Sequence, residues 1–139
     1  MSIMKPDRVF MDADLEDTPE IRYLLSKLGK SPEIVEDSNP VYDLVNAQKD
    51  PISFAKKILY ITQNRGAVIR ECPGTSHYTC CDYTILHSGT FCTLDCSYCI
   101  LQAYFHPPVL QYFAGLDKLN TALDQAFSRQ KIMRIGTGE

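Results

Sequence analysis

Three cysteines, Cys92, Cys96 and Cys99, lie within eight residues in the stretch FCTLDCSYCILQ (residues 91–102), at the spacing C-x3-C-x2-C. Thiolates are ligands for zinc and for iron–sulfur clusters, and they form disulfides in oxidising compartments. A cluster normally has four thiolate ligands, so three from one loop leave one iron with an open coordination position. An open position lets a small molecule bind the metal directly, as in catalytic zinc sites.

A structural zinc site is the alternative chemistry for this loop. Such a site uses closed sets of paired ligands, and Cys96-x2-Cys99 supplies one pair. A second pair would have to come from other residues, namely Cys72, Cys80, Cys81 or Cys92, with His77 or His87 as further donors. Because Cys80 and Cys81 are adjacent, their side chains tend to diverge, which matches a zinc knuckle poorly. Small buried side chains are the simpler interpretation of Cys72, Cys80 and Cys81.

The composition limits the class of protein. The chain has 139 residues, 45% of them hydrophobic, which suits one domain of ordinary size. Its net charge of -3 argues against a broadly basic nucleic-acid surface. Four cations, Lys56, Lys57, Arg65 and Arg70, lie close in sequence and could form a local basic groove, although solvated charges are the simpler interpretation.

The first residues lack the apolar core of a signal peptide, and no apolar run is long enough to span a membrane. We therefore expect a cytoplasmic protein without membrane contacts. In that compartment, metal binding or catalysis explains the cysteines better than a disulfide framework does.

The elements that position the cysteines can be predicted from local patterns. We expect strands over residues 8–11, 33–36, 57–62, 67–70, 83–86, 109–113 and 131–135. We expect helices over residues 19–28, 98–105 and 116 to about 129, the first capped by Thr18 and stopped by Gly29. Residues 37–52 contain Pro40 and Pro51, and we expect mostly loop there, with a helical turn near residues 42–45.

From residue 83 onward the predicted order is strand, cysteine loop, helix, strand. This is a βαβ unit, whose two strands should be parallel. Parallel strands are normally covered on both faces, yet no crossover helix follows the second strand. We therefore expect residues 1–52 to form a small N-terminal α/β unit and linker, and residues 53–139 to form the start of a larger domain that is truncated after its second strand.

The motif C-x3-C-x2-C with an aromatic residue before the last cysteine resembles the signature of the radical SAM superfamily. The longer pattern from Cys92 to Gln102, with the helix start Gly115 to Leu119, is similar to its spore photoproduct lyase branch. The resemblance implies an α/β fold that is the N-terminal portion of a partial (β/α) barrel of radical SAM type, preceded by the small α/β unit. It is specific from about residue 83 onward.

The resemblance also implies cofactors and roles. Cys92, Cys96 and Cys99 would hold a 4Fe-4S cluster, and S-adenosyl-L-methionine (SAM) would occupy the open iron. Tyr98 would lie beside the adenine, and Thr137, Gly138 and Glu139 would match the turn that binds the SAM amino group. The catalytic residues of the branch would lie beyond residue 139.

The implied activity is that of a lyase-like enzyme that generates a 5'-deoxyadenosyl radical, for the repair of a DNA photoproduct. DNA would be its partner, together with an electron donor such as flavodoxin or ferredoxin, and we expect the 139-residue chain to be inactive alone. Two alternatives stay open: a radical SAM enzyme that acts on a non-DNA substrate, and a zinc-binding structural or interaction module.

Overall fold

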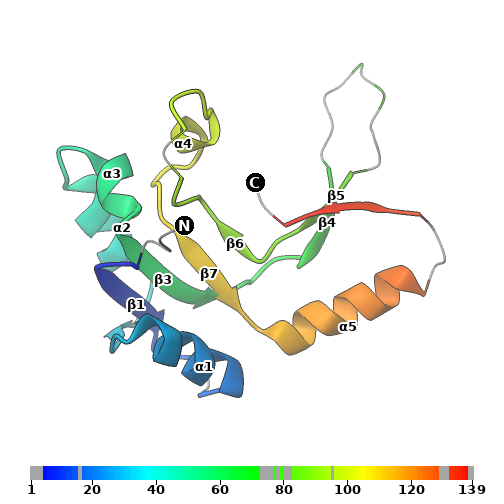
Figure 1. Ribbon diagram of the computed structural model, residues 1–139, viewed down its shortest axis with the longest axis horizontal. Helices are drawn as coiled ribbons and strands as arrows, with labels where there is room; N and C mark the ends of the chain where they lie inside the picture. The colour runs from blue at the N-terminus through cyan, green and yellow to red at the C-terminus, as the bar shows by residue number, and fades with distance from the viewer. Residues whose placement is uncertain are drawn as a thin grey trace.

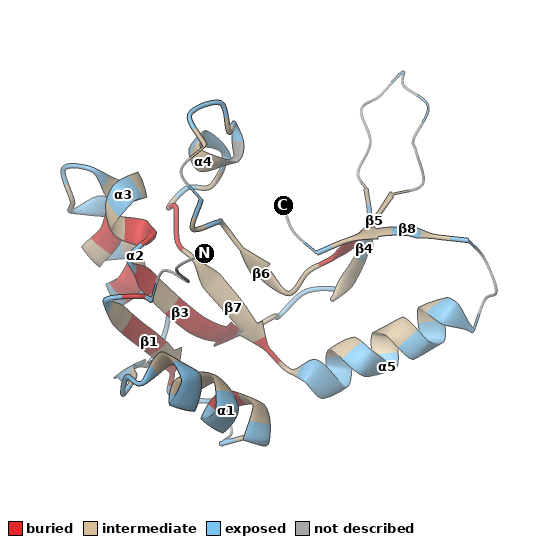
Figure 2. Cartoon of the chain, in the orientation of Figure 1, coloured by how far each residue is buried: buried red, intermediate tan, exposed pale blue. Residues whose placement is uncertain are grey.

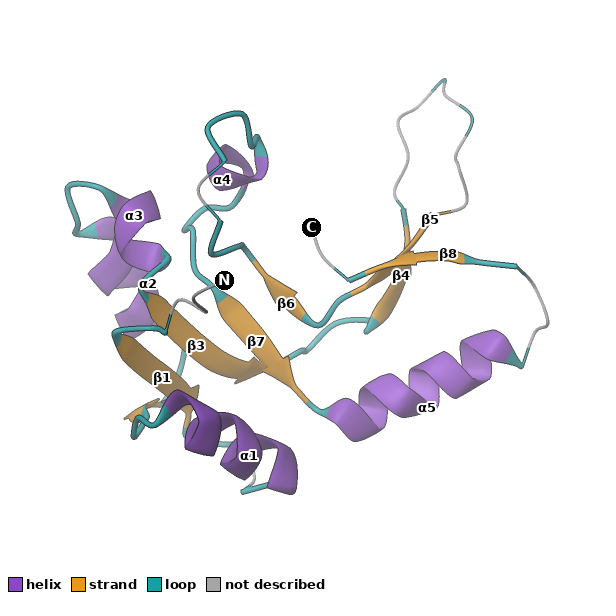
Figure 3. Cartoon of the chain, in the orientation of Figure 1, coloured by secondary structure: helices purple, strands orange, loops and turns teal. Residues whose placement is uncertain are grey.

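The structure is a computed structural model that describes residues 5–15, 17–72, 77, 79, 83–94, 96–128 and 132–137. Its strands are β1 (Arg8–Asp12), β2 (Glu33–Val35), β3 (Ile58–Gln63), β4 (Ile69–Glu71), β5 (Tyr83–Leu86), β6 (Gly89–Thr90), β7 (Gln111–Ala114) and β8 (Arg134–Gly136). Its helices are α1 (Pro19–Leu28), α2 (Asn39–Asn46), α3 (Pro51–Ala55), α4 (Leu101–Tyr104) and α5 (Leu116–Phe127) (Figures 1 and 3). The predicted mixed α/β class is therefore confirmed.

The larger sheet has the strand order β2-β1-β3-β7-β6. Its neighbours run parallel except for β6, which is antiparallel to β7. The strands that follow β1 in the chain, β2 and β3, lie on opposite sides of it. Because crossovers between parallel strands are right-handed, this order places α1 on one face of the sheet and α2 with α3 on the other.

Alternating side chains of β1 and β3 supply a core to each face of this sheet. Figure 2 shows buried residues along both strands. On one face, Val9 and Ile61 pack with Ile21 of α1. On the other face, Phe10 and Tyr60 pack with residues of α2 and α3, namely Val41, Val45 and Ala55. Because successive side chains of a strand point to opposite faces, β1 and β3 are covered on both faces of the sheet, as parallel strands normally are.

The smaller sheet has the order β4-β5-β8. β5 and β8 are parallel, with Tyr83 opposite Arg134, so the predicted pairing of these two strands is confirmed. The helix α5 leads from β7 of the larger sheet to β8 of the smaller one (Figure 1). No residue of α5 is buried, although its sequence is amphipathic. The barrel that the resemblance implies stays a prediction.

The expectation of mostly loop over residues 37–52 is wrong, because α2 and α3 occupy most of this stretch. Both helices carry a proline in their first turn, where the missing backbone N–H would have no helical partner anyway. Asp50 caps α3 by accepting a hydrogen bond from Ser53 N at 3.1 Å. The prolines therefore begin helices here instead of interrupting them.

The five-stranded sheet contains strands from both sides of residue 52, since β1 and β2 precede it and β3, β6 and β7 follow it. The division of the chain at residue 52 stays a prediction. Among the described helices, none is both long enough and apolar enough to cross a membrane.

Candidate metal centre in the cysteine loop

The cysteine loop, residues 91–100, connects β6 to α4. Because β6 is antiparallel to β7, the loop starts at the edge of the larger sheet where β7 begins. Its first residue, Phe91, has a positive φ of 67°, which is uncommon for a residue other than glycine. The Phe91 ring packs against the core under α2 and α3 and meets Phe105 edge-on, with the centroids 6.2 Å apart. The start of the loop is therefore fixed by apolar packing.

The other end of the loop is fixed by two polar side chains. Gln102 Nε2 donates a 2.7 Å hydrogen bond to the carbonyl of Cys96, and Lys56 Nζ donates to Gln102 Oε1 at 3.2 Å. Lys56 is only 6% exposed. The interpretation of Lys56 as a solvated charge is therefore wrong. Its distance of 46 residues from Gln102 in sequence hid this contact, which only the folded chain creates.

The three predicted cluster ligands share this loop and differ in exposure. Cys92 is exposed, whereas Cys96 and Cys99 are half-buried, and all three are free thiols. Cys99 N donates to Cys96 O at 3.1 Å, which closes a turn between them, and Leu94 N donates to Cys92 Sγ at 3.4 Å. Within the described residues, no three side chains of His, Cys, Asp or Glu are gathered closely enough to hold a metal ion. The ligand assignment stays a prediction.

The predicted SAM residues are only partly described. Tyr98 is 90% exposed, so its ring does not pack into a core. Thr137 follows β8, and its carbonyl accepts a 3.5 Å hydrogen bond from Ser88 Oγ, at the link between β5 and β6. The predictions for Gly138 and Glu139 lie outside the described residues. The structure therefore places Thr137 beside Ser88, in the link between β5 and β6 that leads toward the cysteine loop.

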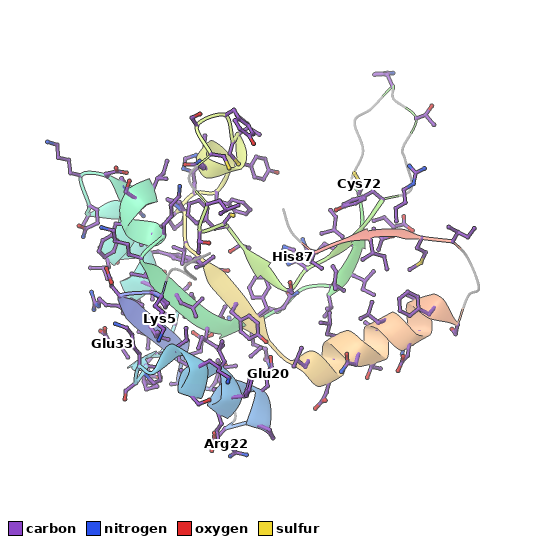
Figure 4. The ribbon with its side chains drawn as sticks, in the orientation of Figure 1. Lys5, Glu20, Arg22, Glu33, Cys72 and His87 are labelled. Atoms are coloured by element: carbon purple, nitrogen blue, oxygen red, sulfur yellow. The ribbon has the colours of Figure 1, made fainter. Side chains whose placement is uncertain are left out.

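Five of the donors considered for a zinc site lie outside the loop, namely Cys72, His77, Cys80, Cys81 and His87. Cys72, half-buried, follows β4, and its backbone N–H donates to Tyr83 O at 2.8 Å. His87 lies after β5 and its ring packs against Phe113, with the centroids 5.2 Å apart (Figure 4). The predictions for Cys80 and Cys81 lie outside the described residues, and His77 is exposed.

Comparisons with known proteins give a match in structure but not in sequence. No family model matches the chain, and no curated protein matches it. A solved structure of a spore photoproduct lyase double mutant with bound AdoMet and dinucleoside spore photoproduct is similar, with a TM-score of 0.65 and 16% identity over 96% of this chain. A single mutant of spore photoproduct lyase with dinucleoside spore photoproduct gives a TM-score of 0.63 and 18% identity over 96% of this chain.

The chain spans about 40% of the length of these solved chains. At such identities the likeness concerns the fold. The α/β arrangement with its parallel sheet is thus one that spore photoproduct lyase also contains.

Proposed function

We propose that this chain belongs to a radical SAM enzyme of the spore photoproduct lyase type. The observation that carries the proposal is the C-x3-C-x2-C loop, Cys92 to Cys99, in a chain whose fold matches spore photoproduct lyase with a TM-score of 0.65. Three cysteines at this spacing are not expected by chance in a chain that also has this fold. The match covers 96% of this chain.

The donor chemistry of the loop fits a 4Fe-4S cluster. Thiolate sulfur is the protein ligand of such clusters, and hydrogen bonds to sulfur stabilise the thiolate form. Cys92 Sγ already accepts one such bond, from Leu94 N. Because the described thiols are not gathered into a metal site, the proposal requires the loop to draw them together when iron and sulfide bind.

In this proposal Cys92, Cys96 and Cys99 hold the cluster, and Tyr98 lies beside the adenine of SAM. Thr137, Gly138 and Glu139 receive the SAM ammonium, since backbone carbonyls and a carboxylate accept its hydrogen bonds. When bound, the cluster and SAM supply one-electron cleavage of a sulfonium C–S bond. Gln102 and Lys56 fix the backbone of Cys96 while the thiols bind.

DNA carrying a photoproduct is the proposed substrate, and a flavodoxin or ferredoxin is the proposed electron donor. Support for DNA comes from the likeness to spore photoproduct lyase alone, because the net charge of -3 gives no sign of a broad basic surface. A radical SAM enzyme with a non-DNA substrate is therefore the alternative that the test must separate.

Anaerobic reconstitution with iron and sulfide tests the cluster. We expect a brown protein with about four irons per chain, and no cluster in the variant with Cys92→Ala, Cys96→Ala and Cys99→Ala. Cys72→Ala is the matched control and should load iron normally. Tight stoichiometric zinc in place of iron, or equal loading of the triple variant, would refute the proposal and favour a zinc module.

Binding of the complete protein to DNA at several salt concentrations tests the substrate. Contacts with phosphates must weaken as salt rises. An affinity that does not change with salt, in a protein that loads its cluster, would favour the non-DNA alternative.

A further inference from the structure

A cavity of about 310 Å³ opens at the edge of the larger sheet where β1 and β3 end. The cysteine loop starts where β7 begins, and Gln111 at the start of β7 lines the cavity, but no residue of the loop does. The strand order reverses between β1 and β3, because β2 lies on one side of β1 and β3 on the other. In open α/β sheets, ligands bind in the crevice beyond the C-terminal ends of strands at such a reversal. The cavity therefore lies where this architecture forms binding sites.

Asp12, the last residue of β1, supplies a buried carboxylate to this cavity. Only 3% of Asp12 is exposed. Its two oxygens accept hydrogen bonds from Tyr60 Oη and, at 2.6 Å, from Thr62 Oγ1. A carboxylate has about four lone-pair positions, so two further donors can be accommodated. Hydroxyl groups of a ligand would supply them at the polar floor of the cavity.

Two arginines, Arg65 and Arg70, line the cavity beyond the end of β3. Neither forms an ion pair with any residue in the described parts of the chain. Arg70 Nε donates to Ala67 O at 3.3 Å, which folds its guanidinium over Gly66. The nearby carboxylate of Asp37 accepts hydrogen bonds from Asn39 instead. The guanidinium groups are thus available to an anion, and they match phosphate geometry well.

Aromatic rings from two elements also line the cavity. Tyr42 of α2 is held by a 2.8 Å hydrogen bond from Gln111 Nε2 of β7, and Phe113 of β7 packs against His87. The volume of about 310 Å³ is that of a small-ligand site. The cavity thus combines a carboxylate that can accept hydrogen bonds from hydroxyl groups, aromatic side chains and the guanidinium groups of two arginines.

We propose that this cavity binds the phosphate monoester of a sugar, either as a free sugar phosphate or as a mononucleotide. The phosphate would meet Arg65 and Arg70, and the sugar hydroxyls would donate to Asp12. The proposal does not depend on the cluster, because none of the residues that line the cavity belongs to the cysteine loop.

Calorimetric titration of the 139-residue chain without iron tests the site, with ribose 5-phosphate, AMP, adenosine and inorganic phosphate as separate ligands. We expect saturable binding of a phosphate monoester, tighter than that of adenosine or phosphate. Tighter binding of AMP than of ribose 5-phosphate identifies a nucleotide site, and equal binding identifies a sugar-phosphate site. No binding of either monoester, or equally tight binding of inorganic phosphate, overturns the proposal.

Variants separate the site from general effects on folding. Arg65→Gln with Arg70→Gln should weaken binding by about tenfold or more, because charge-assisted hydrogen bonds are lost. Gly66→Ala keeps both charges but places a methyl group 2.5 Å from Arg70 Nη2, so it should also weaken binding. Arg22→Gln is the control, since Arg22 lies on α1 outside the cavity (Figure 4). Equal affinity of the double variant and the control, with unchanged melting temperatures, would refute the assignment.

Discussion

Tyr112 Oη donates a 2.6 Å hydrogen bond to Glu20 Oε1, and this bond joins β7 to the first turn of α1. The same carboxylate accepts the backbone N–H groups of Gly115, at 3.2 Å from Oε2, and of Leu116, at 3.0 Å. These donors belong to the start of α5, whose N-cap Gly115 has no capping side chain of its own. Glu20 therefore caps a helix that begins 96 residues later in the chain.

Glu20→Gln should destabilise the fold. The amide keeps the shape of the side chain, but it removes a negative charge from the N-terminal end of α5, where a helix favours anions. We expect the free energy of unfolding to fall by about 1 kcal/mol, as for loss of a helix cap. Chemical denaturation measures it, with Glu36→Gln as the exposed control. An equal loss in both variants would contradict the capping role.

Stability should fall at alkaline pH through Tyr60 and Tyr112. Burial, followed by hydrogen bonds to Asp12 and Glu20 respectively, raises the pKa of both phenols. Because the folded state holds these protons more tightly, their contribution is complete below about pH 10, the ordinary tyrosine pKa, and is lost as pH rises through the raised values.

Denaturation at a series of alkaline pH values measures this effect. Tyr112→Phe should lose less stability above about pH 10 than the unmodified chain does, because the phenylalanine ring has no proton to lose. Tyr23→Phe is the control, since Tyr23 is 65% exposed. Identical slopes for the Tyr112 variant and the unmodified chain would count against the raised pKa.

Helices whose ends are marked by a few adjacent residues could be predicted from the sequence. Thr18 and Gly29 bound α1 as expected: Thr18 Oγ1 accepts from Ile21 N at 3.3 Å, and Gly29 has φ 64°. A proline early in a helix and a proline in a loop look alike in sequence, which is why α2 and α3 were missed. The pairing of β1 with β3 was also beyond local reasoning, because Arg8 lies opposite Ile58 only in the folded sheet.

One part of the candidate site could likewise be predicted from the sequence, and another part could not. The spacing of Cys92, Cys96 and Cys99 is local, so the proposed ligand set could be read from the sequence. The environment of these cysteines is not local, since the hydrogen bond from Lys56 to Gln102 of α4 joins residues 46 positions apart and forms only in the folded chain. The cavity at Asp12 was missed for the same reason: residues from β1, α2, β3 and β7 form it together.

Gly89→Ala should loosen the start of the cysteine loop. Gly89 of β6 pairs with Tyr112 of β7, and a Cβ at Gly89 would overlap the backbone carbonyl oxygen of Gln111. Backbone cannot move aside cheaply, so we expect a loss of about 1–3 kcal/mol in unfolding free energy. Gly66→Ala is the control, because its added methyl group meets the flexible side chain of Arg70. Thermal unfolding of both variants measures the difference, and equal stability would show that β6 can shift.

Lys56→Met should weaken retention of the proposed cluster by releasing Gln102 from its position beneath Cys96. Methionine keeps much of the length and apolar character of the lysine stem but has no ammonium donor for Gln102 Oε1. We expect the reconstituted variant to lose its visible absorbance to an iron chelator several times faster than the unmodified protein. Lys57→Met, at the adjacent exposed residue, is the control. If Lys56→Met lowered the melting temperature but left the bleaching rate equal to that of Lys57→Met, Lys56 would support the fold alone and would not position the loop.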